Sequence, residues 1–176
     1  YRADGNCRAC MVEIEGERVL AASCIRKPTY GMKVKTSSEK AKKSRELVFE
    51  LLLADQPKKE IAHDNNSDFW KWIDKVEVKE SRFPKKTSCQ ADVSHPSMAV
   101  NLDACIQCNL CVRACREVQV NDVIGMAYRG ENSKIVFDFD DPMGDSTCVA
   151  CGECVQACPT GALMPASIVD KDGIGP

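Results

Sequence analysis

The chain has 176 residues, of which 44% are hydrophobic and 6% aromatic, and its formal net charge is -2 at pH 7. This composition lacks the basic excess that binds nucleic acid, so nucleic acid is not an expected partner. No apolar run approaches the roughly 20 residues that a membrane span requires. The chain contains twelve cysteines, which together with the few aromatic residues indicate small modules that fold around metal.

Residues 1–37 form the first predicted module. Apolar and polar residues alternate over 11–14 and 18–21, on either side of Glu15-Gly16-Glu17. This pattern predicts a β-hairpin. A further strand is expected from Met32 to Thr36.

The three cysteines of this module have the spacing Cys7-x2-Cys10-x13-Cys24. This is the downstream part of a variant plant-type 2Fe-2S pattern, in which another cysteine precedes the first pair by about ten residues. We therefore expect three 2Fe-2S ligands here and a fourth upstream of Tyr1. Two alternatives use Cys89, the one cysteine left unassigned: as the fourth cluster ligand, or as part of a zinc site with the other three. The simplest role for Cys89 is a free thiol.

Residues 38–97 are predicted to form a helical segment and a linker. Ser38 is a suitable N-cap for a helix over 38–54, and a second helix is expected from about Asp68 to Val76. The first helix carries apolar residues at helical spacing, which predict its buried face: Leu47, Val48, Leu51 and Leu52. Trp70 and Trp72 are two positions apart and cannot share a helix face, so one should pack inward. His63 and His95 are expected at the surface or as capping groups, and the polar stretch 79–97 as a linker.

Two cysteine runs dominate the last predicted module, residues 98–165. They are Cys105-x2-Cys108-x2-Cys111-x3-Cys115 and Cys148-x2-Cys151-x2-Cys154-x3-Cys158, the second followed by Pro159, and they are offset by 43 positions at every cysteine. CIQCNLCVRAC and CVACGECVQAC agree at six of eleven positions, which indicates a duplication. Strand-like stretches between the runs, 123–128 and 134–139, predict a hairpin insertion.

The spacing of the two runs favours a pair of 4Fe-4S clusters. Each C-x2-C-x2-C loop supplies three thiolates, and in two-cluster ferredoxins the fourth cysteine of each run ligates the other cluster. We therefore assign one cluster to Cys105, Cys108, Cys111 and Cys158, and the other to Cys115, Cys148, Cys151 and Cys154. Structural zinc usually pairs one C-x2-4-C with a distant second pair, which fits these runs poorly. A metal-ligand pattern without a secretory signal indicates a reducing compartment, which we take to be the cytoplasm.

These motifs, with DGNCRACMVEIEG, SRELVFELLLADQP and DSTCVACGECVQACPTGAL, resemble the N-terminal iron-sulfur arm of the alpha subunit of NAD-dependent formate dehydrogenases that contain molybdenum or tungsten. The arm of the respiratory NADH dehydrogenase large subunit and the diaphorase of bidirectional hydrogenases are similar. The resemblance implies an α+β fold: a partial beta-grasp 2Fe-2S domain, a helical segment, and a dicluster bacterial-ferredoxin-like domain with a hairpin insertion. Residues 166–176 would begin a linker to a downstream molybdopterin domain.

The resemblance further implies electron transfer between a molybdopterin formate/CO2 site and a flavin/NADH-binding subunit, through two 4Fe-4S clusters and one 2Fe-2S cluster. The sequence shows no nucleotide-binding glycine motif and no catalytic constellation, so we expect no catalytic residue in this segment. The alternatives are the electron-transfer arm of a hydrogenase or NADH dehydrogenase, a self-contained enzyme, and a stand-alone ferredoxin.

One departure from the relatives concerns the stretch after the first helix. Many relatives carry H-x3-C-x2-C-x5-C there, which holds a histidine-ligated cubane. Here the stretch reads DQPKKEIAHDNNSDFWKW and contains His63 but no cysteine. We expect no cluster at this position.

Overall fold

The computed structural model describes residues 3–86 and 88–169. Its N-terminal part is a small antiparallel sheet in the order β2-β1-β3, formed by β1 (Met11–Ile14), β2 (Ala21–Ala22) and β3 (Val34–Lys35). The predicted hairpin is present, and Glu17 N donates to Ile14 O at 3.0 Å in its turn. Its second strand, expected over 18–21, is shorter and lies later in the chain, since β2 spans Ala21–Ala22.

Two helices follow, α1 (Glu39–Asp55) and α2 (Asp68–Val76). The predicted cap is confirmed, because Ser38 Oγ accepts a hydrogen bond from Ala41 N at 3.3 Å. A short 3-10 turn, η1 (Lys59–Ile61), separates the helices. As predicted for the tryptophan pair, Trp70 is buried, whereas Trp72 is 44% exposed.

The predicted buried face of α1 is wrong in part. The residues that α1 buries are Ala41 and Phe49, whereas Leu51 is 51% exposed. Phe49 packs in a core cluster with Phe69, Trp70 and Ile73 of α2. The helix contacts β1 as well as α2, so its apolar residues are divided between two partners rather than gathered in one stripe.

The C-terminal part begins and ends with paired strands. β4 (Met98–Val100) lies antiparallel to β7 (Leu163–Pro165), which closes the unit. The predicted insertion is a hairpin of β5 (Ile124–Ala127) and β6 (Lys134–Phe137). Two short helices carry cysteines: α3 (Leu110–Arg113), which continues into a π-helical turn, η3 (Ala114–Val118), and α4 (Glu153–Ala157).

Four further 3-10 turns complete this part: η2 (Leu102–Ala104), η4 (Gly130–Asn132), η5 (Met143–Asp145) and η6 (Ala166–Ile168). The predicted linker 79–97 forms no named helix or strand in its described residues, although Asp92 makes an isolated bridge to Val100. The linker expected at 166–176 begins with η6, and residues 170–176 lie outside the described residues.

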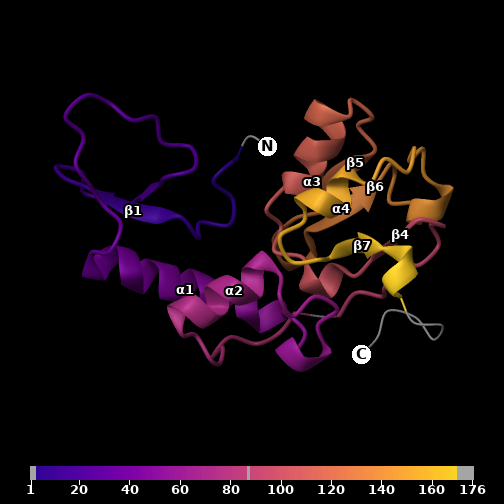
Figure 1. The fold of residues 1–176 in the computed structure, drawn as a ribbon, viewed down its shortest axis with the longest axis horizontal. Helices are drawn as coiled ribbons and strands as arrows, with labels where there is room; N and C mark the ends of the chain where they lie inside the picture. The colour runs from indigo at the N-terminus through magenta and orange to yellow at the C-terminus, as the bar shows by residue number, and fades with distance from the viewer. Residues whose placement is uncertain (1–2, 87, 170–176) are drawn as a thin grey trace.

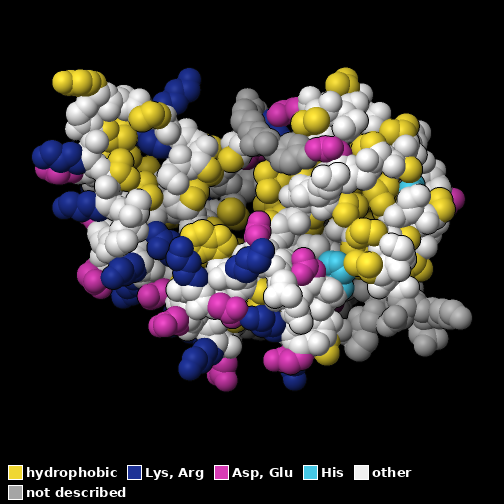
Figure 2. Space-filling view, viewed as in Figure 1, with side chains coloured by type: hydrophobic (Ala, Val, Ile, Leu, Met, Phe, Trp, Pro, Cys, Tyr) yellow, Lys and Arg dark blue, Asp and Glu magenta, His cyan; other side chains and the backbone are white. Residues whose placement is uncertain are grey.

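In Figure 1 the N-terminal sheet lies on one side, the cysteine-rich unit lies on the other, and α1 and α2 run beneath them. Figure 2 shows Lys and Arg side chains gathered mainly over the N-terminal part and the two helices. Gln56, at the end of α1, donates from Nε2 to Ala104 O at 2.9 Å. Phe69 N donates to Pro159 O at 3.1 Å. The helical segment therefore contacts the chain beside the first and the last cysteine of the C-terminal unit.

None of the helices in residues 3–86 and 88–169 is long and apolar enough to cross a membrane.

Candidate metal centres

Four cysteines from both runs surround one small cavity. Cys105 follows η2, Cys108 lies in the loop after it, Cys111 is in the first turn of α3, and Cys158 is the C-cap of α4. We call these four cysteines thiol set I. Burial, with a smaller contribution from the nearby Cys158, raises the pKa of Cys105 to about 11 and that of Cys108 to about 12. Burial also raises the pKa of Cys111, where the other three members of the set add to the shift.

The second group of interacting thiols is Cys148, Cys151, Cys154 and Cys115, which we call thiol set II. Burial raises the pKa of Cys154 to about 12, with further contributions from the other three members. Burial also raises the pKa of Cys148, with Cys151 and Cys115 among the causes. Cys151 is exposed, whereas Cys115 and Cys154 are buried.

These interactions group the fourth cysteine of each run with the opposite run. Cys158 acts on all three members of the first C-x2-C-x2-C loop, and Cys115 acts on two members of the second. The crossed arrangement arises because each fourth cysteine lies about one helical turn beyond its own loop. At that place α3 and α4 pack against each other, which brings the fourth cysteine of one run close to the loop of the other. Cys154 also raises the pKa of Cys111, so the two sets are neighbours.

Hydrogen bonds to sulfur repeat between the two sets. Gln107 N donates to Cys105 Sγ at 3.4 Å, and the corresponding Ala150 N donates to Cys148 Sγ at 3.5 Å. The crossed cysteines have partners too. Val123 N donates to Cys115 Sγ at 3.4 Å, and Thr160 Oγ1 lies 3.5 Å from Cys158 Sγ. Such donors stabilise a sulfur that carries negative charge and tune the potential of a cluster bound to it.

The three N-terminal cysteines also form a group. Burial opposes ionisation of Cys10, but hydrogen bonds from Cys24 and Ser23 outweigh it and lower the pKa of this thiol. Burial and the neighbouring Cys10 raise the pKa of Cys24, and Cys7 contributes to the same shift. The fold therefore brings together the three cysteines that the sequence assigns to a 2Fe-2S cluster. We call them the N-terminal trio.

The trio lies beside thiol set I. Cys7 is close enough to Cys108 to raise the pKa of that thiol. An ion pair joins the two parts: Arg113 Nε donates to Asp4 Oδ2 at 2.8 Å, and Arg113 Nη2 donates to Asp4 Oδ1. The side chains of Arg113 and Asp4 are 19% and 22% exposed. Such bidentate pairs fix geometry as well as adding energy.

The donor sets fit iron-sulfur clusters. Within residues 3–86 and 88–169, no three His, Cys, Asp or Glu side chains converge as the ligands of a single metal ion. A cubane spreads its four thiolates around four irons, so its ligands lie farther apart than those of one ion. Burial and the neighbouring thiols favour the protonated form of Cys105, Cys108, Cys111, Cys148 and Cys154 by raising the pKa of each. Binding of iron would replace these protons with positive charge.

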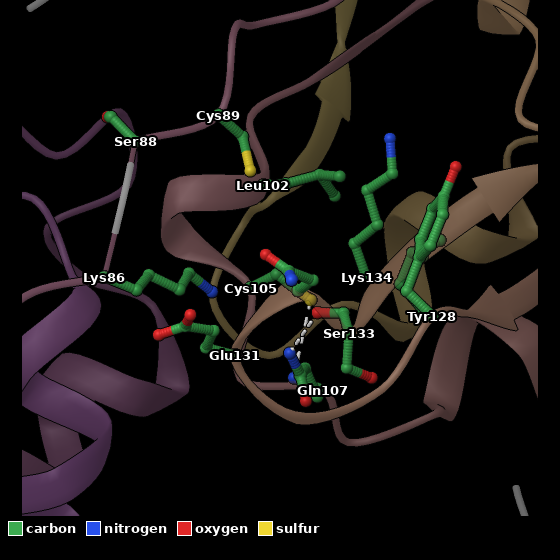
Figure 3. Close-up of a pocket in the computed structure, with 12 residues that line it drawn as sticks. Lys86, Ser88, Cys89, Leu102, Cys105, Gln107, Tyr128, Glu131, Ser133 and Lys134 are labelled. Atoms are coloured by element: carbon green, nitrogen blue, oxygen red, sulfur yellow. Dashed lines mark hydrogen bonds between the residues drawn. The ribbon is translucent and has the colours of Figure 1, made fainter.

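Cys89 lies near Cys105 of thiol set I. It lines a cavity of about 450 Å³ together with Cys105, Lys86 and Lys134, and its sulfur points towards Leu102 (Figure 3). Its backbone N donates to Asp103 Oδ1 at 2.7 Å. Cys89 also raises the pKa of Cys105. These contacts favour the free-thiol interpretation over a fourth ligand for the trio.

The two histidines differ in exposure: His63 is exposed, as predicted, whereas His95 is buried. His95 is 6% exposed, and its Nδ1 accepts a hydrogen bond from Ser97 N at 3.2 Å, so it is a capping group in a buried place. The ring of His63 lies against Gly161, where an added Cβ would come within 2.1 Å of Cε1. Burial lowers the pKa of His63.

Sequence reasoning missed several residues that shape these centres. Asp4 and Gln56 have partners 109 and 48 positions away, and no local pattern indicates such pairs. A comparison of the two cysteine runs could have singled out Asn109, because Gly152 occupies the corresponding position in the second run.

The class of these centres follows from domain matches. Residues 1–39 match the 2Fe-2S iron-sulfur cluster binding domain, and residues 104–162 match the 4Fe-4S dicluster domain. The chain thus combines one 2Fe-2S domain with one 4Fe-4S dicluster domain.

Particular relatives are components of oxidoreductases. The chain is 35% identical to the HndD component of the NADP-reducing hydrogenase of Solidesulfovibrio fructosivorans, over 90% of this chain and 28% of that protein. It is 33% identical to a component of the NADH-quinone oxidoreductase of Rhizobium meliloti, over 90% of this chain and 19% of that protein. It is 30% identical to a putative formate dehydrogenase of Staphylococcus haemolyticus, over 95% of this chain and 17% of that protein.

A solved structure is similar in fold over nearly the whole chain. The crystal structure of an NAD+-reducing [NiFe]-hydrogenase in the H2-reduced state aligns with a TM-score of 0.84 and 26% identity, over 93% of this chain and 70% of that chain. The chain spans only 17 to 28% of the length of the three curated relatives. The arm is therefore homologous to parts of NADH dehydrogenase, hydrogenase and formate dehydrogenase-like proteins.

Proposed function

We propose that this chain is the electron-transfer arm of a formate dehydrogenase alpha subunit and connects a flavin/NADH-binding subunit with a molybdopterin formate/CO2 site. When bound, iron-sulfur clusters accept and release single electrons. The observation that carries the proposal is the succession of three thiol groups, in which the N-terminal trio lies beside set I and set I lies beside set II.

The proposed ligand sets are Cys105, Cys108, Cys111 and Cys158 for one 4Fe-4S cluster, and Cys115, Cys148, Cys151 and Cys154 for the other. Cys7, Cys10 and Cys24 would hold a 2Fe-2S cluster with a fourth ligand that precedes Tyr1. The proposed domains are a beta-grasp 2Fe-2S part over 1–37, a helical segment over 38–97, a dicluster domain over 98–165 and a linker from 166. The proposed location is the cytoplasm.

The residues around the three groups hold them at fixed spacing. The ion pair between Asp4 and Arg113 docks the trio against set I. The crossed cysteines Cys115 and Cys158 tie the two sets of the dicluster domain together. In this proposal the residues bind, space and shield the clusters, and bond-breaking chemistry belongs to other domains.

The second candidate is the corresponding arm of a hydrogenase or an NADH dehydrogenase. It is favoured by HndD and the solved hydrogenase, both of which align with at least 90% of this chain. The formate proposal is supported by the putative formate dehydrogenase, which aligns with 95% of this chain.

The experiment that separates the candidates uses the purified full-length protein with its natural subunits. Formate, hydrogen and NADH are supplied in turn under anaerobic conditions, and reduction of the clusters is followed by electron paramagnetic resonance. Reduction by formate and by NADH supports the proposal. Reduction by hydrogen but not formate would show that the parent is a hydrogenase.

A second experiment tests the docking of the trio. Arg113→Lys retains the charge but loses the bidentate geometry, so electron exchange between the 2Fe-2S and 4Fe-4S clusters should slow in freeze-quench measurements. Arg116→Lys is the matched control, because Arg116 pairs with Asp122 on the exposed side of the same helical run. Equal rates in both variants would contradict a docking role for the pair.

A further inference from the structure

The two cluster-binding loops share a backbone conformation but differ in one side chain that concerns the clusters directly. Asn109 lies between Cys108 and Cys111, and Gly152 is its counterpart 43 positions later. Both adopt left-handed backbone, with φ of 66° and 75°. Glycine adopts this conformation freely, and asparagine tolerates it better than most residues. At this position, therefore, only the first loop carries a carboxamide.

The carboxamide of Asn109 belongs to the cavity of thiol set I. Asn109 lines this cavity together with all four cysteines of the set. Within the described residues, its Oδ1 is buried and has no hydrogen-bond partner. Buried polar atoms almost always have partners, so one without calls for an explanation.

A cluster bound by set I would supply the missing partner. The oxygen and nitrogen ends of a carboxamide exchange by a half-turn about χ2, which barely changes the shape of the side chain. After this rotation, Nδ2 occupies the position of the unsatisfied Oδ1. There an N–H group can donate to a cluster sulfur.

We infer that Asn109 donates a hydrogen bond to a sulfur of the cluster held by thiol set I and thereby raises its reduction potential above that of the cluster held by set II. This inference rests on the proposed assignment of the two cubanes. An added electron increases the negative charge on the cluster sulfurs, so a donor stabilises the reduced form more than the oxidised form. In this proposal Asn109 contacts the cluster by a hydrogen bond and is not one of its iron ligands.

The hydrogen bonds to cysteine sulfur described above are balanced between the sets. Each set has one backbone donor to the first cysteine of its loop, and each crossed cysteine has one further partner, Val123 N or Thr160 Oγ1. Nearby charges differ: Lys86 acts on Cys105, and Asp138 acts on Cys148. Lys86 should raise the potential of the set I cluster and Asp138 should lower that of the set II cluster, so both charges widen the difference that Asn109 is proposed to create. The test must therefore change Asn109 alone.

The test is a redox titration of the full-length protein followed by electron paramagnetic resonance. Asn109→Gly gives the first loop the residue of the second, and the midpoint potential of the set I cluster should fall. Asn109→Asp has nearly the same shape but adds negative charge in place of a donor, so it should lower the midpoint further. Gly152→Asn is the reciprocal variant. An added Cβ there meets nothing within 4 Å, and the midpoint of the set II cluster should rise.

Gln107→Ala is the matched control. Gln107 lies in the same loop with φ of 53°, and its counterpart in the second run is Ala150. Its Nε2 donates to Ser133 O at 2.5 Å, and the substitution keeps the backbone N–H that donates to Cys105 Sγ, so this variant should leave both midpoints unchanged. An equal shift in Gln107→Ala would overturn the inference, because the loop and not the amide would then be responsible.

An unchanged midpoint in Asn109→Gly at full iron content would also overturn the inference. If Asn109→Gly loses its cluster, Gly152→Asn decides: a rise supports the inference, and no rise overturns it. Iron and acid-labile sulfide are counted in the unaltered protein first. A count below the roughly eight irons of two cubanes would instead refute the proposed cluster assignment.

Discussion

The crossed ligand sets make a prediction that sequence order alone would reverse. Cys115 belongs to the first run by position, but its thiol interacts with Cys148 and Cys154. Cys115→Ser should therefore damage the cluster of thiol set II and spare that of set I. Each cubane holds four irons, so the two dicluster sites together should fall from about eight irons to about four.

Reference variants identify the cluster that is lost. Cys151→Ser removes a ligand that belongs to set II under either assignment, and Cys108→Ser removes one that belongs to set I. The electron paramagnetic resonance spectrum of reduced Cys115→Ser should match that of Cys151→Ser. A match with Cys108→Ser would refute the crossed assignment.

Double variants give an independent check, because losses within one cluster do not add. Cys115→Ser combined with Cys151→Ser should still retain about four irons in the dicluster sites, whereas Cys115→Ser combined with Cys108→Ser should retain almost none. The opposite pattern would show that Cys115 serves the cluster nearest in sequence.

Three further predictions concern stability and the unassigned thiol. Gln56→Ala removes the hydrogen bond to Ala104 O and leaves a buried carbonyl without a partner, so the free energy of unfolding should fall by about 1–3 kcal/mol. Guanidinium denaturation at matched iron content measures this change, with Gln119→Ala as the control. The pKa of Cys105 is raised to about 11 without iron, so protons compete with iron throughout the neutral range, and cluster retention against a chelator should increase as the pH rises towards that value. A retention that decreased with pH would contradict this sign. Cys89→Ser should leave the iron content and every cluster signal unchanged, and loss of the 2Fe-2S signal would restore Cys89 as a ligand.

The repeat made much of the dicluster unit predictable. Cysteine spacing constrains the backbone locally, since two or three residues between ligands leave few loop shapes. The left-handed residues Gln107, Asn109, Ala150 and Gly152 recur at matching positions for this reason. The hairpin insertion was predictable on similar grounds, because its alternating residues need no distant partner to form strands.

Contacts between distant segments were not predictable in the same way. Phe49 is buried on α1 while Leu51 is exposed, because α1 packs against both β1 and α2 and a periodic pattern cannot say which partner takes which residue. The ion pair of Asp4 with Arg113 spans 109 positions, and nothing in either neighbourhood distinguishes it from a surface charge. Sequence therefore predicts ligand sets from the cysteine spacing, but it does not indicate the contacts that hold the ligand groups side by side.

The helical segment explains how the proposed relay can work without a cluster of its own. Its stretch from Gln56 to Phe69 contains no cysteine, yet it contacts the chain beside both ends of thiol set I. Gln56 bonds to Ala104, His63 lies on Gly161, and Phe69 bonds to Pro159. These contacts can shield set I from water. In the proposed relay the N-terminal trio exchanges electrons with set I directly, since the ion pair of Asp4 with Arg113 holds the two parts together.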